Sequence, residues 1–265
     1  MKSKTDLSDV TFLILVRLDS IDRLQNILEV TQFLSSNFKT NIWVSEYSPF
    51  KDSLLEKLLI KTIRYTFNED NDPILYRTKF LNQMTLSVKS PFVAIWDTDV
   101  LAPIGQINLS VELLRKGEAD FVYPYDNYFF DTTSILRKLY LKERKIDLLE
   151  QNTKKMKEMY SPNPVGGAFL ANLNSYKEAG LENENFYGWG LEDGERVARW
   201  GNLNYKIHRV TGPLFHLSHG RGINSAFHND DQHLIKTKEI KNVRRNISVN
   251  CYQPNLEKIK KSIIE

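Results

Sequence analysis

The sequence has very little cysteine, since Cys251 is the only one in 265 residues. A single cysteine excludes an internal disulfide and a zinc site built from several cysteines, and it is typical of a reducing compartment. No apolar run approaches the ~20 residues that a membrane-spanning helix needs. The N-terminal MKSKTDLSDV also lacks the apolar core of a signal peptide. We therefore expect a cytoplasmic protein.

The chain also lacks a strong excess of charge of either sign. Its 36 Lys and Arg against 33 Asp and Glu give a formal net charge of +3. A nucleic-acid partner usually requires a denser basic patch, so we expect none. The sequence contains no internal repeat and no low-complexity linker. Its 41% of hydrophobic residues are enough for a substantial core.

Strand-like and helix-like segments alternate along the first hundred residues. The apolar runs 10–18 and 91–101 fit strands that are buried on both faces. Helical spacing of apolar residues follows Ser20, a suitable N-cap. We expect further strands at 40–47, 63–68, 120–125 and 204–210, a loop that enters a strand at 162–173, and helices at 53–63, 74–89, 105–118, 134–160 and 175–181. This alternation predicts an open, mostly parallel α/β sheet flanked by helices, which binds its ligands at the carboxyl ends of strands.

The apolar run 91–101 contains two acids, Asp97 and Asp99, at its carboxyl end. Hard divalent cations take oxygen ligands, and a cation that bridges two phosphates needs only one or two protein carboxylates. An isolated Asp-x-Asp is common by chance, however, and it equally fits a polar transition from strand to loop.

Two histidines, His216 and His219, lie three positions apart in FHLSHGRG. Neutral imidazole binds Mn²⁺ and similar metals readily. Taken alone, the pair equally fits one histidine in the core and one on the surface.

The segment FYGWGLEDGERVARW (186–200) joins an aromatic corner to an amphipathic helix. Gly188 and Gly190 allow unusual backbone angles and a close approach to a ligand. Trp189 between them offers a flat apolar face that suits a sugar ring. Glu192 and Asp193 open the helix, where acids also stabilise the helix dipole. Capping would explain one acid, but it does not explain an indole held between two glycines.

Together these motifs resemble the inverting, metal-dependent GT-A glycosyltransferases related to the β-1,4-galactosyltransferases, in a bacterial form. The segment 188–193 matches the family's Gly-Trp-Gly-x-Glu-Asp block, and 97–99 matches its Asp-x-Asp motif. LYRTKFLNQ (75–83) is similar to a helix whose arginine helps to hold the nucleotide, and PVGGAF (164–169) is similar to a Gly-Gly donor loop. The resemblance covers residues 10–222.

The resemblance implies a GT-A fold, a UDP-sugar donor and a bound Mn²⁺ or Mg²⁺. Asp99, His219 and His216 would be the metal ligands, and Asp97 would contact the ribose or the metal's water shell. The other implied donor-binding residues are Arg77, Gly166 and Gly167, with Arg17, Asp19 and Arg23 as candidates for uridine and phosphate contacts.

Inverting transfer implies a base for the attacking hydroxyl of a glycan or lipid-linked saccharide acceptor. The resemblance assigns this role to Asp193, with Glu192 holding sugar hydroxyls. Trp189 and Gly190 would form the wall that places the acceptor. The product would be a surface polysaccharide.

The chain departs from the family pattern at three places. Gly194-Glu195 stands where the family usually continues with further aspartates, which puts one acceptor contact in doubt. Pro164 occupies the position that senses donor size, so galactose, glucose and their N-acetyl forms all stay open. The first strand ends in VRLDSIDR (16–23) and not in Pro-Phe-Arg-x-Arg.

We expect one GT-A domain over 1–235, with a nucleotide-binding half at about 1–101 and an acceptor half at about 102–235. The polar segment 219–236 has two glycines and is a candidate lid, or else a static loop. The tail 236–265 is basic and fits a helix that contacts anionic membrane or is simply solvated.

Two other functions remain open at this point. A sugar-nucleotide hydrolase or nucleotidyltransferase would use the same Asp-x-Asp metal chemistry, but it would give Trp189 and the Gly-Gly loop no role. A non-catalytic carbohydrate-binding protein would use the aromatics without needing the metal ligands.

Overall fold

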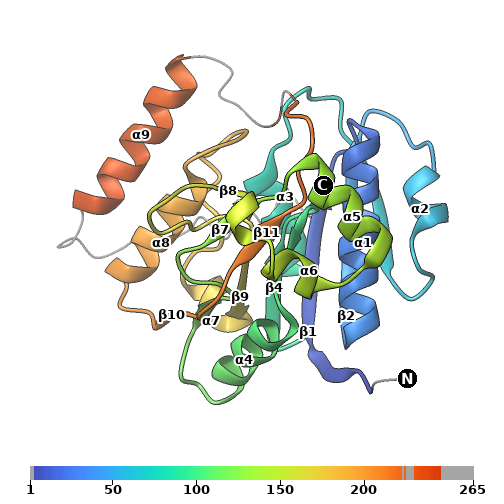
Figure 1. The fold of residues 1–265 in the computed structure, drawn as a ribbon. Helices are drawn as coiled ribbons and strands as arrows, with labels where there is room; N and C mark the ends of the chain where they lie inside the picture. The colour runs from blue at the N-terminus through green and yellow to red at the C-terminus, as the bar shows by residue number, and fades with distance from the viewer. Residues whose placement is uncertain (1–2, 223, 225–229, 246–265) are drawn as a thin grey trace.

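The structure, a computed structural model, describes residues 3–222, 224 and 230–245. Its main sheet has seven strands (Figure 1). Their order across the sheet is β10 (Ile207–Arg209), β6 (Phe121–Tyr123), β9 (Ala168–Asn172), β4 (Phe92–Trp96), β1 (Thr5–Val16), β2 (Phe38–Ser48) and β3 (Arg64–Glu69). Every neighbouring pair is parallel except the two that involve β9. The predicted mostly parallel sheet is confirmed.

A second sheet of four short strands completes the β structure. Its order is β5 (Val100–Leu101), β11 (Leu214–His216), β7 (Phe129–Asp131) and β8 (Lys157–Glu158). Because β4 belongs to the first sheet and β5 to the second, residues 97–99 form the turn between the two sheets. This turn carries the Asp-x-Asp motif.

Helices pack around the sheets. They are α1 (Ile21–Asn37), α2 (Leu54–Leu58), α3 (Arg77–Leu86), α4 (Ile104–Arg115), α5 (Ser134–Glu143), α6 (Ile146–Glu150), α7 (Leu173–Glu178), α8 (Glu192–Asn202) and α9 (Asp230–Arg245), with a 3-10 turn at Thr153–Lys155. Helices α1, α3, α4 and α7 contact strands of the main sheet, whereas α9 packs on α8. The predicted N-cap of α1 is confirmed, since the Ser20 side chain accepts a hydrogen bond from the Arg23 amide.

Two predicted elements are divided in the structure. The expected strand 91–101 breaks after Trp96, whose indole Nε1 donates to the Val100 carbonyl at 3.0 Å and spans the turn. The expected helical segment 134–160 breaks at Arg144, whose left-handed backbone (φ 53°) ends α5. It then continues as α6, the 3-10 turn and β8.

The expected boundary at residue 236 falls inside α9, so the division into a domain and a tail stays a prediction. The remainder of the tail, 246–265, lies outside the described residues. Among the helices that the structure describes, none is long and apolar enough to span a membrane.

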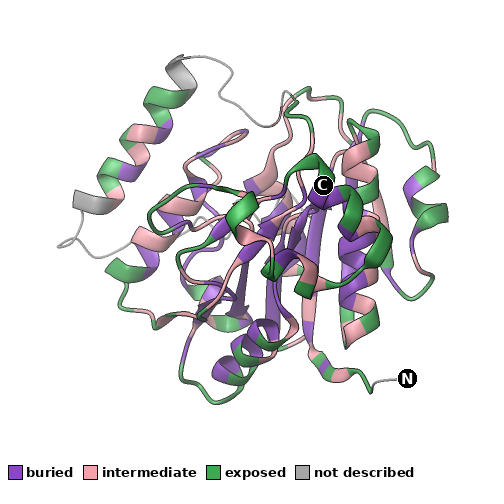
Figure 2. Ribbon diagram, in the orientation of Figure 1, coloured by how far each residue is buried: buried purple, intermediate pink, exposed green. Residues whose placement is uncertain are grey.

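Aromatic side chains fill the core where α8 meets the main sheet, and Figure 2 shows the buried residues concentrated along the central strands. Trp200 of α8 stacks on Phe121, with 3.7 Å between ring centroids and 9° between planes. Phe169 and Tyr176 meet the same indole edge-on. This packing fixes the helix that begins with Glu192 and Asp193.

Replacing Trp200 with alanine should lower the free energy of unfolding by about 3–5 kcal/mol, because a fully buried indole leaves a large cavity. Urea denaturation followed by circular dichroism measures this loss. The control Leu203→Ala removes an exposed side chain just past the same helix and should change stability by less than about 0.5 kcal/mol. Equal losses in the two variants would contradict the role of the aromatic cluster.

Candidate active site

Three predicted metal ligands meet between the two sheets. One ligand atom each from Asp99, His216 and His219 lies within 4.8 Å of the others. His219 Nε2 is 3.1 Å from Asp99 Oδ2, and His216 Nε2 is 3.8 Å from Asp99 Oδ1. The antiparallel pairing of β5 with β11 brings them together, and the Leu217 amide donates to the Asp99 carbonyl at 2.7 Å.

Both histidines are oriented by acceptors on their other ring nitrogen. His216 Nδ1 is 2.8 Å from Asp131 Oδ1, and His219 Nδ1 is 2.7 Å from the Gly220 carbonyl. A proton kept on each Nδ1 would let the Nε2 atoms beside Asp99, once deprotonated, offer their lone pairs to an ion, which is the usual arrangement of metal-binding histidines. One carboxylate and two imidazoles suit Mn²⁺ or a similar ion, so the residues present fit a metal.

Sequence reasoning missed Asp131. Its role depends on the parallel pairing of β7 with β11, which sets Asp131 opposite His216. The segment FFDTT gives no sign of that pairing in the sequence.

The charges around Asp99 favour its ionised form. Burial alone would raise its pKa, but His216, His219 and Arg23 together hold the pKa well below its usual range. Burial lowers the pKa of His216, whereas Asp99 and Asp131 raise it more, so the net shift is upward.

Asp97 turns away from the metal ligands toward a different partner. Its Oδ1 lies 2.7 Å from Arg77, the arginine predicted to hold the nucleotide. Burial raises the pKa of Asp97 to about 6, despite the opposing effect of Arg77. Asp97 is outside the group of three possible ligands that the described residues form, and its contact with ribose or water stays a prediction.

The Gly-Gly loop lies directly against this turn. The Asp97 amide donates to the Gly167 carbonyl at 2.9 Å. Gly167 has φ +84°, and a Cβ there would come within 2.8 Å of Leu214. A Cβ on Gly166 would lie 2.9 Å from Asp193 Oδ2. The Gly-Gly loop therefore contacts Asp97 on one side and Asp193, the predicted catalytic base, on the other.

Asp193 is held in place by a buried arginine. Its Oδ1 is 2.5 Å from Arg196, whose other terminal nitrogen is 2.8 Å from Glu182. The Arg196 and Glu182 side chains are only 2% and 1% exposed, whereas Asp193 is 30% exposed. Glu182, Arg196 and Asp193 thus form a network of ion pairs, and Asp193 is its solvent-accessible member and can contact a ligand.

Positive backbone angles shape the corner before α8. Gly188, Gly190 and Leu191 have φ of 73°, 102° and 71°. Lys236 of α9 donates to the Trp189 carbonyl at 2.6 Å and ties this helix to the corner. The Trp189 side chain is half-buried. Sequence reasoning placed Lys236 at the edge of the tail and gave it no role.

Glu192 is buried against this corner. Its Oε2 has no hydrogen-bond partner among the described residues. Burial, followed by repulsion from Asp193, raises the pKa of Glu192 to about 7, while Arg77 and Lys236 oppose the rise. A carboxyl of this kind can donate or accept a hydrogen bond near neutral pH.

The departure Gly194-Glu195 has a structural explanation. Glu195 is buried and pairs with Arg199 one helical turn later, at 2.8 Å. Arg199 also donates to the Ala179 and Leu181 carbonyls. Glu195 therefore holds α8 on the preceding loop and does not face a ligand.

The three N-terminal candidates lie in different surroundings. Arg17 pairs with Asp70 and donates to the Tyr47 and Asp72 carbonyls, so it binds three strand ends together. Asp19 pairs with Arg23 at 2.9 Å, and Arg23 reaches within 3.6 Å of Asp99 Oδ2. Only Arg23 of the three comes close to the metal cluster. Their contacts with a donor stay predictions.

The candidate lid is described only in part, because residues 223 and 225–229 lie outside the described residues. Asn224 Oδ1 accepts a hydrogen bond from the Leu75 amide at 2.8 Å, just before α3. A Cβ on Gly222 would lie 2.9 Å from Asp19. The described part of the segment therefore passes beside the N-terminal candidates.

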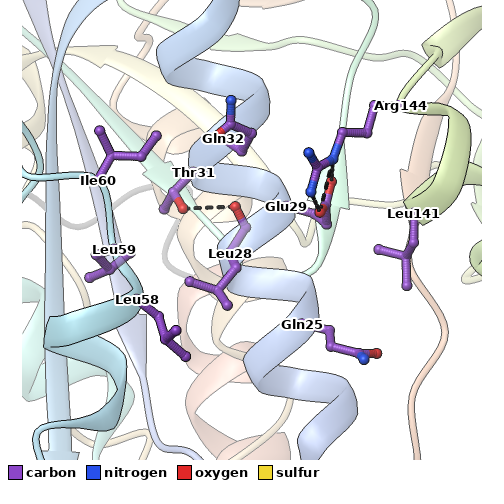
Figure 3. A pocket seen from close by; sticks show the side chains of 10 residues that line it. All are labelled: Gln25, Leu28, Glu29, Thr31, Gln32, Leu58, Leu59, Ile60, Leu141 and Arg144. Carbon is purple, nitrogen blue, oxygen red and sulfur yellow. Dashed lines mark hydrogen bonds and ion pairs between the residues drawn. The ribbon is translucent and has the colours of Figure 1, made fainter.

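A separate pocket of about 310 Å³ lies away from this site, between α1, α2 and α5 (Figure 3). Its lining combines Leu28, Leu58 and Leu141 with the ion pair of Glu29 and Arg144. It contains none of the predicted site residues.

Comparison with known proteins supports the fold but not a family. No family model matches this sequence, and no curated protein matches it. Solved structures of glycosyltransferases are similar to it. The catalytic domain of Drosophila β1,4-galactosyltransferase 7 with xylobiose has a TM-score of 0.53 at 17% identity, covering 86% of this chain and 80% of that chain. A mutant of the same Drosophila enzyme with manganese, UDP-Gal and xylobiose has a TM-score of 0.51 at 15% identity, covering 94% of this chain and 83% of that chain.

Glucosyl-3-phosphoglycerate synthase from Mycobacterium tuberculosis, with Mn²⁺, UDP and glucosyl-3-phosphoglycerate, has a TM-score of 0.52 at 14% identity, covering 92% of this chain and 81% of that chain. At these identities the likeness establishes the fold alone. The chain therefore has the GT-A glycosyltransferase fold.

Replacing Asp131 with alanine should weaken Mn²⁺ binding about 10–100-fold, because His216 loses the acceptor that orients it. Asp131→Asn keeps an acceptor oxygen, so its Mn²⁺ affinity should fall less. Asp99→Asn replaces a ligand carboxylate, so its Mn²⁺ affinity should fall more. Titration calorimetry measures these affinities, with Asp147→Asn on α6 as the exposed control. Wild-type affinity in Asp131→Ala would show that the carboxylate does not support the site.

The pH dependence of stability should report on Glu192. The pKa of Glu192 is raised from 4.5 to about 7 in the folded chain. The stabilisation of the fold that comes from this shift is therefore fully present below pH 4.5 and is lost as the pH rises through 7. Between pH 5 and 8 the free energy of unfolding should fall by about 2–3 kcal/mol less in Glu192→Gln than in the wild type. Denaturation at several pH values tests this. Glu178→Gln, an exposed control, should keep the wild-type pH profile.

Proposed function

We propose that this chain is a metal-dependent inverting glycosyltransferase. It moves a hexose or N-acetylhexosamine from a UDP-sugar to a hydroxyl of a glycan or glycolipid, in surface polysaccharide synthesis. One observation carries the proposal: His216 and His219 meet Asp99 at the turn that contacts the Gly-Gly loop, and the same loop lies against Asp193. The fold and the ligands bound in the similar solved structures support the same class.

Asp99, His216 and His219 would hold Mn²⁺ or Mg²⁺. Such an ion, when bound, offsets the charge that develops on a diphosphate leaving group. Arg77 and Arg23 supply further positive charge on either side of the Asp-x-Asp turn. These arginines would bind the donor's phosphates and keep Asp97 and Asp99 from repelling it.

Asp193 would accept the proton of the acceptor hydroxyl as its oxygen attacks the anomeric carbon. Its ion pair with Arg196 holds the carboxylate in one orientation, while Oδ2 stays against the Gly-Gly loop. Attack from the side opposite the leaving group inverts the anomeric centre. An α-linked donor would therefore give a β-linked product.

Glu192 and the Trp189 corner would bind sugar. Glu192 Oε2, which has no partner in the described part of the chain, would be satisfied by a hydrogen bond from a sugar hydroxyl. Trp189, with Gly190 beside it, would place the acceptor ring. The protein would work in the cytoplasm, with peripheral contact between the basic tail and anionic membrane.

A screen of UDP-sugars with Mn²⁺ tests the proposal. UDP release that requires both one preferred sugar nucleotide and a saccharide acceptor is the expected result. Release at the same rate without acceptor would favour a sugar-nucleotide hydrolase. Binding of saccharides with no turnover of any donor would favour a carbohydrate-binding protein.

Asp193→Asn should lower kcat about 10²–10⁴-fold, because an amide cannot accept the hydroxyl proton. Mn²⁺ affinity should stay as in the wild type, since Asp193 is not in the ligand cluster. Initial rates and calorimetry measure the two effects, and Glu178→Gln is the matched acid-to-amide control. An active Asp193→Asn variant would rule out Asp193 as the base.

A further inference from the structure

Helix α5 presents an unusual outer face. Its inward side is formed by Leu136, Arg137 and Tyr140, which are buried. At 100° per residue, the opposite side consists of Ile135, Lys138, Leu139 and Lys142. Ile135 is 75% exposed and Leu139 is 41% exposed, and both lysines are exposed as well. Two large aliphatic side chains thus alternate with two cations on one solvent-facing stripe, which we call the α5 face.

The lysines of the α5 face form no ion pairs with the described acids of the neighbouring helices, although α6, which packs on α5, carries the exposed Asp147 and Glu150. The acids of α1 that lie beside α5 are already paired, Asp22 with Arg137 and Glu29 with Arg144. Glu143, the one acid in α5, pairs with Lys145 at 3.8 Å. Neither Lys138 nor Lys142 forms an ion pair with any residue in the described part of the chain.

Exposed aliphatic side chains also occur on the neighbouring helices. Ile21, at the start of α1, is 75% exposed and adjoins Asp22, which contacts α5. The pocket of Figure 3, between α1, α2 and α5, combines Leu28, Leu141 and the 50% exposed Leu58 with the polar side chains of Gln25, Glu29 and Gln32. Single exposed aliphatics are common, but their clustering with unpaired lysines is not explained by packing.

We propose that the α5 face docks on an anionic lipid surface. Aliphatic side chains that enter the headgroup region, flanked by lysines that meet lipid phosphates, are the features of an interfacial helix. A protein partner fits less well. A helix of 10 residues is about 15 Å long, and its outer face alone is smaller than the roughly 800 Å² that each side of a stable protein interface buries.

The docking surface also has a defined relation to the candidate active site. Ser134, the first residue of α5, follows Asp131 by three positions, and Asp131 orients His216. Docking through α5 would hold the metal cluster near the membrane. The inference does not depend on the proposed function, because lipid binding is measured without turnover.

The test uses the full chain and sedimentation with two kinds of vesicle, phosphatidylcholine alone and phosphatidylcholine mixed with an equal amount of phosphatidylglycerol. The wild type should bind the anionic vesicles and not the neutral ones. Lys138→Gln/Lys142→Gln should bind about 25-fold more weakly, because each lysine near an anionic surface contributes about fivefold. Ile135→Ser/Leu139→Ser should bind the anionic vesicles about tenfold more weakly, or weaker still, because less apolar surface enters the lipid.

Two controls carry matched changes elsewhere. Leu109→Ser/Leu203→Ser alters two other exposed aliphatic side chains, which are 47% and 43% exposed, and Lys89→Gln/Lys116→Gln removes the same charge from exposed positions. Both should bind like the wild type. All variants keep residues 246–265, so binding through the tail would leave the α5 variants unchanged. That result would overturn the proposal, as would equal loss in the controls or no binding to anionic vesicles.

Discussion

The candidate active site depends on the pairing of β5 with β11. This contact is only two residues long on each side, yet it is the one that sets His216 against the turn containing Asp99. The turn itself is spanned by the Trp96 indole, which donates to the Val100 carbonyl inside the core. Because β5 and the residues of β11 before His216 are buried, these hydrogen bonds are shielded from water and keep the three ligand atoms close together.

A second constraint is the separation of negative charges. The site gathers Asp97, Asp99, Glu192 and Asp193, which would repel one another in a desolvated space. Three of these acids have an arginine beside them. Arg77 pairs with Asp97, Arg23 lies near Asp99, and Arg196 pairs with Asp193. Glu192 has no such pairing with an arginine in the described residues, and its pKa is raised to about 7. The histidines and Arg23 lower the pKa of Asp99, whereas burial raises the pKa of Asp97 despite its pairing with Arg77.

Local patterns in the sequence predicted much of this arrangement. The apolar runs of β1 and β4, the Ser20 cap and the helix after Gly190 all follow from residue type and spacing. Taken singly, the Asp-x-Asp motif and the His216–His219 pair are weak evidence for a metal site, because each also fits an ordinary protein surface. Their combination was informative, and the structure brings Asp99 and both histidines into one cluster.

Other features had no local signal. Asp131 could not be connected with His216 because β7 and β11 pair across 85 residues of chain. Glu195 resembled part of an acidic motif, but burial beside Arg199 gives it a structural role. Arg17 was grouped with Arg23 by position, although it points to Asp70 and the neighbouring strand ends. Lys236 lies at the Trp189 corner only because α9 packs on α8.

The sequence by itself determined the alternating α/β pattern, the types of side chain at the strand ends and the glycines that allow close approach. These depend on short-range spacing and on backbone freedom at single residues. Only the tertiary structure decided which carboxylate faces the histidines, which acids pair with arginines, and which face of α5 stays exposed. These depend on strand pairing and helix packing between residues far apart in the chain, and no local pattern encodes those distances.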